Sequence, residues 1–339
     1  MSGGRQHKRP VSEKKINELI NSFQRKNFAK VIKEAQILLT EFPESPVIWD
    51  VLAAAAAQKK DFDKAVYAFQ KVIFLQPNNV KAHYNLGVIL KIKGQLDDAL
   101  RAYKSVIKIQ PNHPQAHNNM GNIFKNKGML EKAINAYRKA IKLKPNYAEA
   151  FNNMGSALND LGKPDEAIEA LNQAIKLKPD YAGAYLNKSM ALLKNQEFEK
   201  GFELHEWRWN TDNHGSNFLQ SSKPLWNGQK NKTVFLWAEQ GIGDEIMYSS
   251  LIPELHKICS KLIVQCDKRL IPLFKRSFHK DISYYDKSDT VIDTLYDFHI
   301  SSGSLPRIFR KSLKSFDNTN NGYLFHDKCR TKHLRKALI

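Results

Sequence analysis

The sequence contains little cysteine, and its three cysteines form no CxxC pair and no spacing typical of a zinc site. We therefore expect no metal site and no cofactor, and a reducing, cytoplasmic compartment. Long apolar runs are also missing, so no membrane-spanning segment is predicted. The first residues are basic but are not followed by an apolar stretch, which favours a disordered basic arm over residues 1–11 and excludes a secretory signal.

Acidic residues are underrepresented, because 34 Asp and Glu face 53 Lys and Arg and leave a net charge of +19. The basic residues are spread along the chain without an arginine-rich block or a nucleic-acid motif, which makes nucleic acid an unlikely partner class. Two interpretations of the charge remain open. In the first, the positive charge attracts an anionic ligand such as a nucleotide-sugar phosphate. In the second, the charge only reflects a lysine-rich surface with no specific ligand.

A 34-residue period extends over residues 12–215. Prolines mark it at Pro43, Pro77, Pro111, Pro145 and Pro179, and small residues at Ala53, Gly87, Gly121, Gly155 and Ser189. This period and pattern resemble the tetratricopeptide repeat. The predicted units are residues 12–45, 46–79, 80–113, 114–147, 148–181 and 182–215.

Each unit is expected to fold as two helices, with Gly94, Gly128 and Gly162 in the turns between them. Small residues would let the two helices approach closely. One pair of helices cannot bury its own apolar faces, so the predicted architecture is an α-helical superhelix of stacked pairs with a concave groove.

Asparagine recurs at one position of the repeat, at Asn85, Asn119, Asn153 and Asn187. A row of amides in the groove can pair with the backbone of an extended peptide without reading its side chains. The row resembles the asparagine ladder of the O-linked N-acetylglucosamine transferase superhelix, and this resemblance implies a protein or peptide partner. The alternative is that these amides bond to neighbouring helices.

The repeats end in the sequence EWRW, and Trp207, Trp209 and Trp226 cluster where two domains would meet. Large aromatic residues stabilise interfaces efficiently, so packing at a domain interface is favoured over a sugar-stacking platform. The intervening polar stretch with Gly and Ser predicts a linker over residues 216–232.

Residues 233–250 predict a buried strand, a Gly-Ile-Gly turn and a helix that opens at Asp244. In α/β proteins, ligands bind where a strand, a glycine turn and a helix follow one another. Two nucleotide fingerprints fail here, because Ile246 replaces the third glycine of a dinucleotide site and no Gly-Lys-Ser/Thr of a P-loop is present.

Further strands are predicted at residues 262–267 and 282–286, and a fourth strand with its loop at residues 296–306. Together with EWRW, PLW-G, AEQGIGD and SLP, this order resembles bacterial proteins in which tetratricopeptide repeats precede a heptosyltransferase-like glycosyltransferase domain, related to family nine and of GT-B fold. The resemblance implies a Rossmann-like N-terminal half over residues 233–327. Residues 328–339 would then be the start of an interdomain connector.

The same resemblance implies roles for the turn. Asp244 would be the general base that deprotonates an acceptor hydroxyl in glycosyl transfer, with Glu239, Gln240, Gly241 and Gly243 forming the acceptor-side loop. No metal is implied. The alternative for Asp244 is an ordinary helix N-cap.

A GT-B enzyme binds its nucleotide-sugar donor in a second Rossmann domain, and this sequence ends where that domain would begin. The predicted function is therefore that of a tetratricopeptide protein with a partial glycosyltransferase domain. Its family transfers sugar from a nucleotide-sugar to a protein or glycan hydroxyl. The alternative is a non-catalytic scaffold for protein–protein interaction.

Overall fold

The computed structural model describes residues 11–211, 218–319, 322–328 and 331. The chain divides into two compact units, Met1–Leu161 and Gly162–Ile339, and each is described by itself. The arm predicted over residues 1–11 and the connector predicted over residues 328–339 lie almost entirely outside the described residues. No helix in the described part of the chain is both long and apolar enough to cross a membrane.

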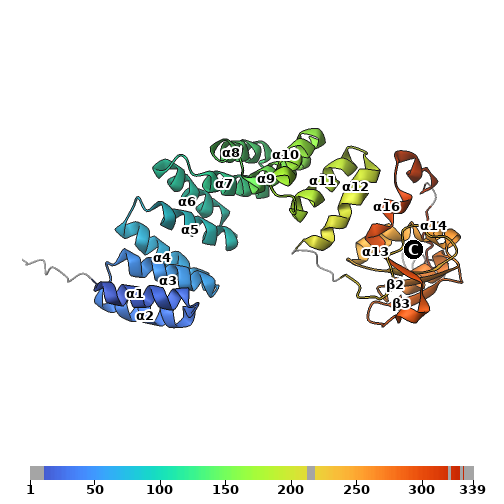
Figure 1. The fold of residues 1–339 in the computed structure, drawn as a ribbon, viewed down its shortest axis with the longest axis horizontal. Helices are drawn as coiled ribbons and strands as arrows, with labels where there is room; N and C mark the ends of the chain where they lie inside the picture. Colours follow the sequence, from blue (N-terminus) through green and yellow to red (C-terminus); the bar gives the residue numbers. More distant parts are fainter. Residues whose placement is uncertain (1–10, 212–217, 320–321, 329–330, 332–339) are drawn as a thin grey trace, which may run out of the picture. The chain divides into compact units, whose positions relative to one another are not determined.

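The first unit is built from consecutive helices that pack against one another (Figure 1). They are α1 (Glu13–Gln24), α2 (Phe28–Glu41), α3 (Pro46–Gln58), α4 (Phe62–Leu75), α5 (Val80–Ile92), α6 (Leu96–Ile109), α7 (Pro114–Asn126), α8 (Leu130–Leu143) and α9 (Ala148–Asp160). Equivalent helices recur every 34 residues, and α9 is the first helix of the next pair.

The small residues allow the close helix packing that the sequence predicts. A Cβ added at Gly87 would lie 2.7 Å from the Tyr103 ring, and one at Gly121 would lie 2.5 Å from the Tyr137 ring. Each glycine therefore leaves room for a buried tyrosine of the following helix. The core continues along the unit through alanines of both helices in each pair.

The turns within the pairs use left-handed backbone. Gly94, Gly128 and Gly162 have φ angles of +76°, +73° and +80°, which confirms their predicted place in the turns. The same turn position is occupied in other repeats by residues that also have positive φ, namely Lys26, Lys60 and Gln196.

The second unit begins with the last helices of the repeat series. They are α10 (Pro164–Leu177), α11 (Ala182–Lys194), α12 (Phe198–His205) and the 3-10 turn η1 (Glu206–Asn210). Helix α12 packs on the short helix α16 (Pro306–Phe309), which follows the last strand. A tilted ring contact between Phe198 and Phe316, and an ion pair between Glu199 and Lys311, join α12 to the segment that follows α16.

A four-stranded parallel sheet forms the centre of the remaining part. Its strands are β1 (Thr233–Trp237), β2 (Lys261–Cys266), β3 (Ser283–Asp286) and β4 (Phe298–Ser301), in the spatial order β3-β2-β1-β4. Val234 pairs with Leu262 on one side and with Phe298 on the other. The strands follow the predicted segments, and this part of the chain is an α/β fold.

Both faces of the sheet are covered, as the continuous apolar strands require. The helices between the strands are α13 (Ile242–Ser249), α14 (Ile252–Ile258) and α15 (Ile271–Ser277). Val234 and Leu236 belong to one core with residues of these helices, whereas Phe235 and Trp237 pack on the opposite face with Trp209. Short 3-10 turns complete the unit as η2 (Asp293–Leu295), η3 (Ser302–Ser304) and η4 (Leu313–Thr319).

The three tryptophans predicted to pack at a domain interface have different environments. Trp209 packs against Trp237 of β1, and Trp207 stacks on Tyr185 of α11 with ring centroids 4.0 Å apart. Trp226, within the stretch predicted as a linker, is fully buried in the sheet core and donates a backbone hydrogen bond to His299 O of β4. The C-terminal half of residues 216–232 therefore packs as part of the sheet.

Candidate functional site

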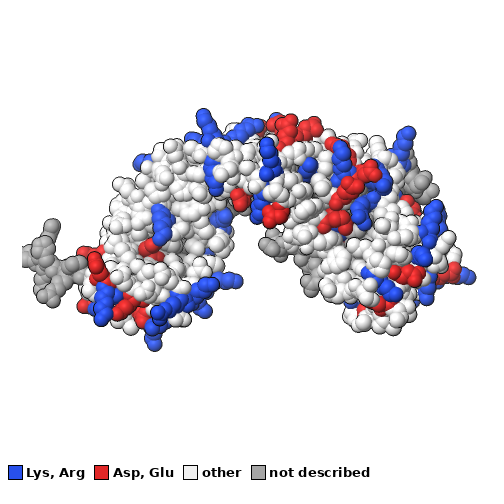
Figure 2. All heavy atoms as spheres, viewed as in Figure 1, with Lys and Arg blue, Asp and Glu red and all other residues white. Residues whose placement is uncertain are grey.

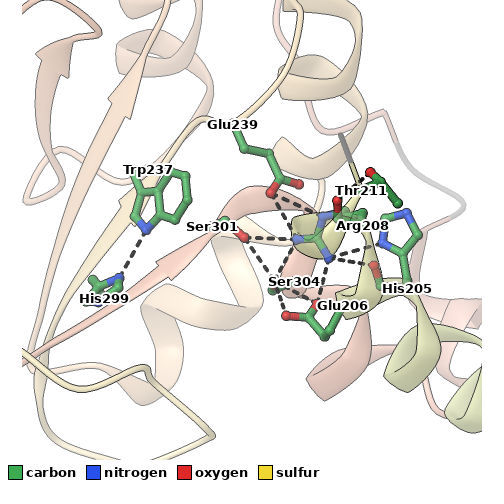
Figure 3. A network of polar contacts seen from close by, with 9 residues as sticks. All are labelled: His205, Glu206, Arg208, Thr211, Trp237, Glu239, His299, Ser301 and Ser304. Carbon is green, nitrogen blue, oxygen red and sulfur yellow. Dashed lines mark hydrogen bonds and ion pairs between the residues drawn. The ribbon is translucent and has the colours of Figure 1, made fainter. Parts of the chain in front are cut away.

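A buried polar network surrounds Arg208 in the η1 turn (Figure 3). The guanidinium is 2% exposed and donates to Glu239 from Nη2 at 2.9 Å and from Nε at 3.3 Å. Nη1 donates to Glu206 Oε1 at 2.8 Å and to the His205 carbonyl at 3.1 Å. Nη2 also lies 2.8 Å from Ser304 Oγ.

These contacts account for the hydrogen-bonding capacity of the side chain, because a guanidinium has five N–H donors. Burial alone would lower the pKa of Arg208, but attraction to Glu239 and Glu206 raises it above its usual value. Arg208 is therefore a permanently charged group whose donors are used inside the protein.

Glu239, predicted for the acceptor-side loop, lies two residues after the end of β1 and is 2% exposed. Its Oε2 accepts from Arg208, while Oε1 has no hydrogen-bond partner in the described residues and is packed against Gly303. A Cβ added at Gly303 would overlap this oxygen, so glycine is required there. The carboxylate is enclosed by protein and does not line an open surface.

A pocket of about 530 Å³ lies beside this network, in the second unit. It is lined by the start of α11, by η1 and by the loop after β1. Asn187, Asn210 and Gln240 line it together, and we call it the amide pocket. Its other lining residues are Lys178, Asp180, Tyr181, Ala182, Gly183, Leu186, His205, Arg208 and Thr211.

Two residues singled out for different reasons in the sequence thus line the same pocket. Asn187 was predicted as part of a groove ladder, and Gln240 as part of an acceptor-side loop. Asn210 was not predicted, because nothing in the sequence marks a single asparagine after EWRW.

Asp244 is the third residue of α13, whose N-cap is Gly241. Its backbone N–H lies 3.1 Å from Gly241 O, and its half-buried carboxylate extends back over the same glycine. It does not line the amide pocket. The helix begins at Ile242, before Asp244, so Asp244 does not have the N-cap position considered as its alternative.

The two loop glycines are not demanded by local geometry. Gly241 has extended backbone, with φ of −75° and ψ of 169°. A Cβ at Gly243 would meet nothing within 4 Å. Their place in an acceptor-side loop remains a prediction.

Glu245, beside Asp244, is a buried carboxylate that sequence reasoning missed. Its Oε2 accepts the Asp267 N–H at 2.7 Å, and its Oε1 lies 2.6 Å from Lys287 Nζ. Lys287 also donates to the Gln240 carbonyl at 2.6 Å. This chain of contacts ties the loop after β1 to the ends of β2 and β3. The only sequence signal was a charged residue on the apolar side of a helix.

The asparagines of the first unit make contacts within the repeats. Asn119 is buried, and its amide nitrogen donates to the hydroxyls of Tyr84 and Tyr103 at 3.2 and 3.3 Å. Asn153 is half-buried and donates to Asn118 at 3.1 Å. Bonds to neighbouring helices, the alternative to a peptide ladder, therefore exist at both positions. Asn85 is half-buried on α5.

Charges of both signs are intermixed on the face shown in Figure 2, where Lys and Arg lie among Asp and Glu. Many pair across neighbouring helices, as Lys81 does with Asp50 at 2.9 Å and Lys125 with Asp160 at 3.3 Å. No group of three or more His, Cys, Asp or Glu residues that could hold a metal ion occurs in the described residues.

Two family profiles match the repeats. The profile described as TPR repeat matches residues 55–91, 89–128 and 121–162, and that described as Tetratricopeptide repeat matches residues 148–181. Residues 55–181 are thus tetratricopeptide repeats, a fold suited to protein–protein interaction.

The chain spans less than a third of the length of the curated relative that it matches. Protein FlbA of Caulobacter vibrioides is 24% identical over an alignment of 168 positions, and the match covers 44% of this chain and 28% of FlbA. The C-terminal part of a TPR repeat-containing protein from Cytophaga hutchinsonii is 20% identical, with a TM-score of 0.50 over 57% of this chain and 77% of that chain. MamA from Desulfovibrio magneticus is 22% identical, with a TM-score of 0.48 over 51% and 99%. The Cytophaga structure supports the helical repeat fold.

Proposed function

We propose that this protein binds a partner polypeptide through its repeats and holds an extended, uncharged segment of it in the amide pocket. The observation that carries the proposal is the position of Asn187, Asn210 and Gln240 around one pocket. A side-chain amide both donates and accepts, which is the hydrogen-bonding pattern of a peptide backbone. The volume, about 530 Å³, is within the range of ligand pockets.

The charge of the pocket also favours a neutral ligand. The donors of Arg208 are occupied by protein acceptors, so the guanidinium offers no hydrogen bond to an anion. Lys178 and Asp180 line the same pocket with opposite charges. A phosphate would therefore find little net positive charge here.

Fluorescence anisotropy with a labelled pool of random ten-residue peptides of Gly, Ala, Ser, Thr and Asn tests this proposal. We expect the pool to bind, and a pool with N-methylated backbones to bind much more weakly. Gln240→Ala and Asn187→Ala should each weaken binding by roughly 3–10-fold, because each removes hydrogen bonds worth ~1 kcal/mol.

The matched controls are Gln173→Ala and Asn172→Ala, which alter exposed amides on α10 outside the pocket. They should leave the affinity unchanged. Equal binding of the two peptide pools would show that the backbone is not what is recognised, and equal affinity of all four variants would remove the pocket from the function.

The proposal also includes the predicted asparagine ladder of the first unit. There, Asn85 and Asn153 would pair with the backbone of the peptide. Replacing Asn153 by Ala should weaken peptide binding without a large loss of stability. Asn119→Ala should mainly destabilise the repeats, because the hydroxyls of the half-buried Tyr84 and the buried Tyr103 would lose their partner. An unchanged affinity in Asn153→Ala would exclude the ladder.

Glycosyl transfer is a second candidate, and the strand order favours it. The chain runs from β1 through β2 to β3 on one side and places β4 on the other side of β1. The strand order therefore reverses direction at β1. In open parallel sheets, ligands bind beside such a reversal, at the carboxyl ends of the strands. The loop with Gln240, Gly241 and Asp244 follows β1 at that point. In this proposal the segment is a Rossmann-like acceptor half, Asp244 is the general base and a nucleotide-sugar is the donor.

Transfer of radiolabel from nucleotide-sugars to protein acceptors tests this second candidate. We expect Asp244→Asn to abolish transfer and Asp281→Asn, an exposed carboxylate after α15, to preserve it. Undiminished transfer by Asp244→Asn would exclude Asp244 as the base. Absence of transfer by the parent with any donor would leave this second candidate without support.

A further inference from the structure

Two parts of the lining of the amide pocket are connected by the side chain of Arg208, whose N–H donors are all bonded to protein acceptors. The wall around η1 carries His205, Asn210 and Thr211, and the loop after β1 carries Gln240. We infer that Arg208 is a positioning residue for this pocket. It acts through Glu239 on Gln240, and it contributes no hydrogen bond of its own to the ligand. This inference rests on the proposed peptide-binding pocket.

Arg208 contacts three segments that are distant in sequence (Figure 3). Nη1 bonds within the η1 region, to Glu206 and the His205 carbonyl. Nε and Nη2 bond to Glu239, which directly precedes Gln240. Nη2 also bonds to Ser301 at the end of β4 and to Ser304 in η3. The three sequence motifs EWRW, AEQGIGD and SLP therefore meet at one guanidinium.

The geometry explains why arginine is needed. A planar guanidinium directs N–H groups in three directions at once, whereas a lysine ammonium has three donors on a single nitrogen. The carboxylate of Glu239 cannot move away from Arg208, because its other oxygen is packed against Gly303. The position of the backbone at residue 239, and so of Gln240, follows from the position of Arg208.

A second contact fixes the other end of the same residue. Lys287 donates to the Gln240 carbonyl and pairs with the buried Glu245. With its carbonyl held by Lys287 and the preceding residue held by Arg208, Gln240 has little freedom. The pocket is therefore organised before a ligand arrives, which lowers the entropic cost of binding.

The experiment uses the full chain and the uncharged peptide pool. Arg208→Met alone leaves Glu239 buried without its cation and is expected to lower Tm strongly. The double variant Arg208→Met/Glu239→Gln removes the two fully buried charges and leaves only the partly exposed Glu206, so we expect a Tm closer to the parent than that of Arg208→Met but an affinity at least 10-fold weaker. Arg208→Lys should recover part of the affinity lost in Arg208→Met. A merely structural role would change Tm and affinity together.

A milder variant keeps the test decisive if the others do not fold. Ser304→Ala removes one acceptor of Arg208 and one donor to Glu206, so we expect peptide binding to weaken several-fold and Tm to fall by less than in Arg208→Met. Parental affinity in Ser304→Ala, or in a folded double variant, would overturn the inference. Failure of the parent itself to bind the pool would instead overturn the proposed function, so the two failures are distinguishable.

Discussion

At the residue scale, buried polar side chains stabilise this protein by binding one another across long sequence distances. Asn119 joins two tyrosines, Glu245 joins a backbone N–H and a lysine, and Arg208 joins two carboxylates and two serines. Burial raises the pKa of Tyr103 well above its usual value, so its hydroxyl stays protonated beside Asn119. Each of these groups would be costly to bury without its partners.

Histidine gives the first unit a predictable dependence on pH. His113 is the N-cap of α7, and its Nδ1 accepts the Ala116 N–H at 3.1 Å, which requires an unprotonated Nδ1. Burial lowers the pKa of His113 and of His117 below the usual value near 6.5. The unfolded chain therefore binds protons more readily than the folded one, so stability is full above that value and is lost as the pH falls below it.

We expect Tm measured from pH 8 to pH 5 to decrease below pH 6.5, and the decrease to be smaller in His113→Asn. Asparagine is also a good N-cap but does not titrate in this range. An identical pH dependence in the parent and in His113→Asn would contradict this origin of the effect.

Motifs and repeats in the sequence identify individual candidate residues, but they do not predict which distant residues contact one another. Asn187 and Gln240 were singled out from a repeat and from a motif, and the structure places both at one pocket. The role of Arg208 could not be predicted, because its partner Glu239 is 31 residues away and the pairing depends on the fold. The enclosure of Glu239 was missed for the same reason.

At the element scale, the helical pairs depend on their turns. Every described turn between paired helices from Lys26 to Gln196 has one residue in the left-handed region, and only three of those residues are glycine. A side chain with a Cβ is strained in this conformation. In the repeats with lysine or glutamine at this position, the strained backbone therefore lowers the stability of the turn, and in the glycine repeats it does not.

Replacing Lys60 by glycine should stabilise the protein. Lys60 has φ of +61°, and we expect Lys60→Gly to increase the free energy of unfolding by about 0.5–1 kcal/mol, after the extra flexibility of glycine in the unfolded chain is counted. Denaturant unfolding followed by circular dichroism measures this change.

Lys59 is the matched control, because it is the C-cap of α3 with an ordinary φ of −84°. Lys59→Gly should be neutral or destabilising. Stabilisation by both substitutions would point to removal of positive charge as the cause and would contradict the role of the backbone.

The helices and strands were largely predictable because their signals are local. A 34-residue period gives the helical pairs, and apolar runs bounded by turn residues give the strands. The packing of residues 224–226 on the sheet was not predicted from the sequence. The polar composition of the segment before β1 predicts a linker, yet Trp226 is buried in the sheet core because the sheet offers it an apolar surface that the sequence does not display.

At the scale of the whole molecule, the chain forms two compact units, and the second combines the last helices of the repeats with the sheet. The sequence predicts the change from helices to an α/β segment near residue 215. The contacts of α12 with α16 and of Arg208 with the strand ends place these parts in one unit. Such a combination depends on tertiary contacts, which a repeat pattern does not contain.

Damage to the sheet core should therefore remain within the second unit. Trp226→Ala removes a fully buried ring, with an expected cost of about 3–5 kcal/mol. We expect hydrogen exchange measured by mass spectrometry to accelerate in β1, β4 and α12 but not in α3–α6. Phe69→Ala in α4 is the reciprocal control and should accelerate exchange in the first unit. Uniform acceleration in both variants would mean that the units unfold together.

The segment around Trp226 also governs how the sheet meets other chains. His299 of β4 directs both its N–H and its carbonyl away from β1, and both are bonded by the backbone of Pro224 and Trp226. An unpaired strand edge is a template for aggregation, and a proline beside it cannot donate to a further strand. The bridge therefore opposes strand addition at His299 on the β4 side, and we expect any growth of this sheet into a fibril or a strand-swapped dimer to begin at β3.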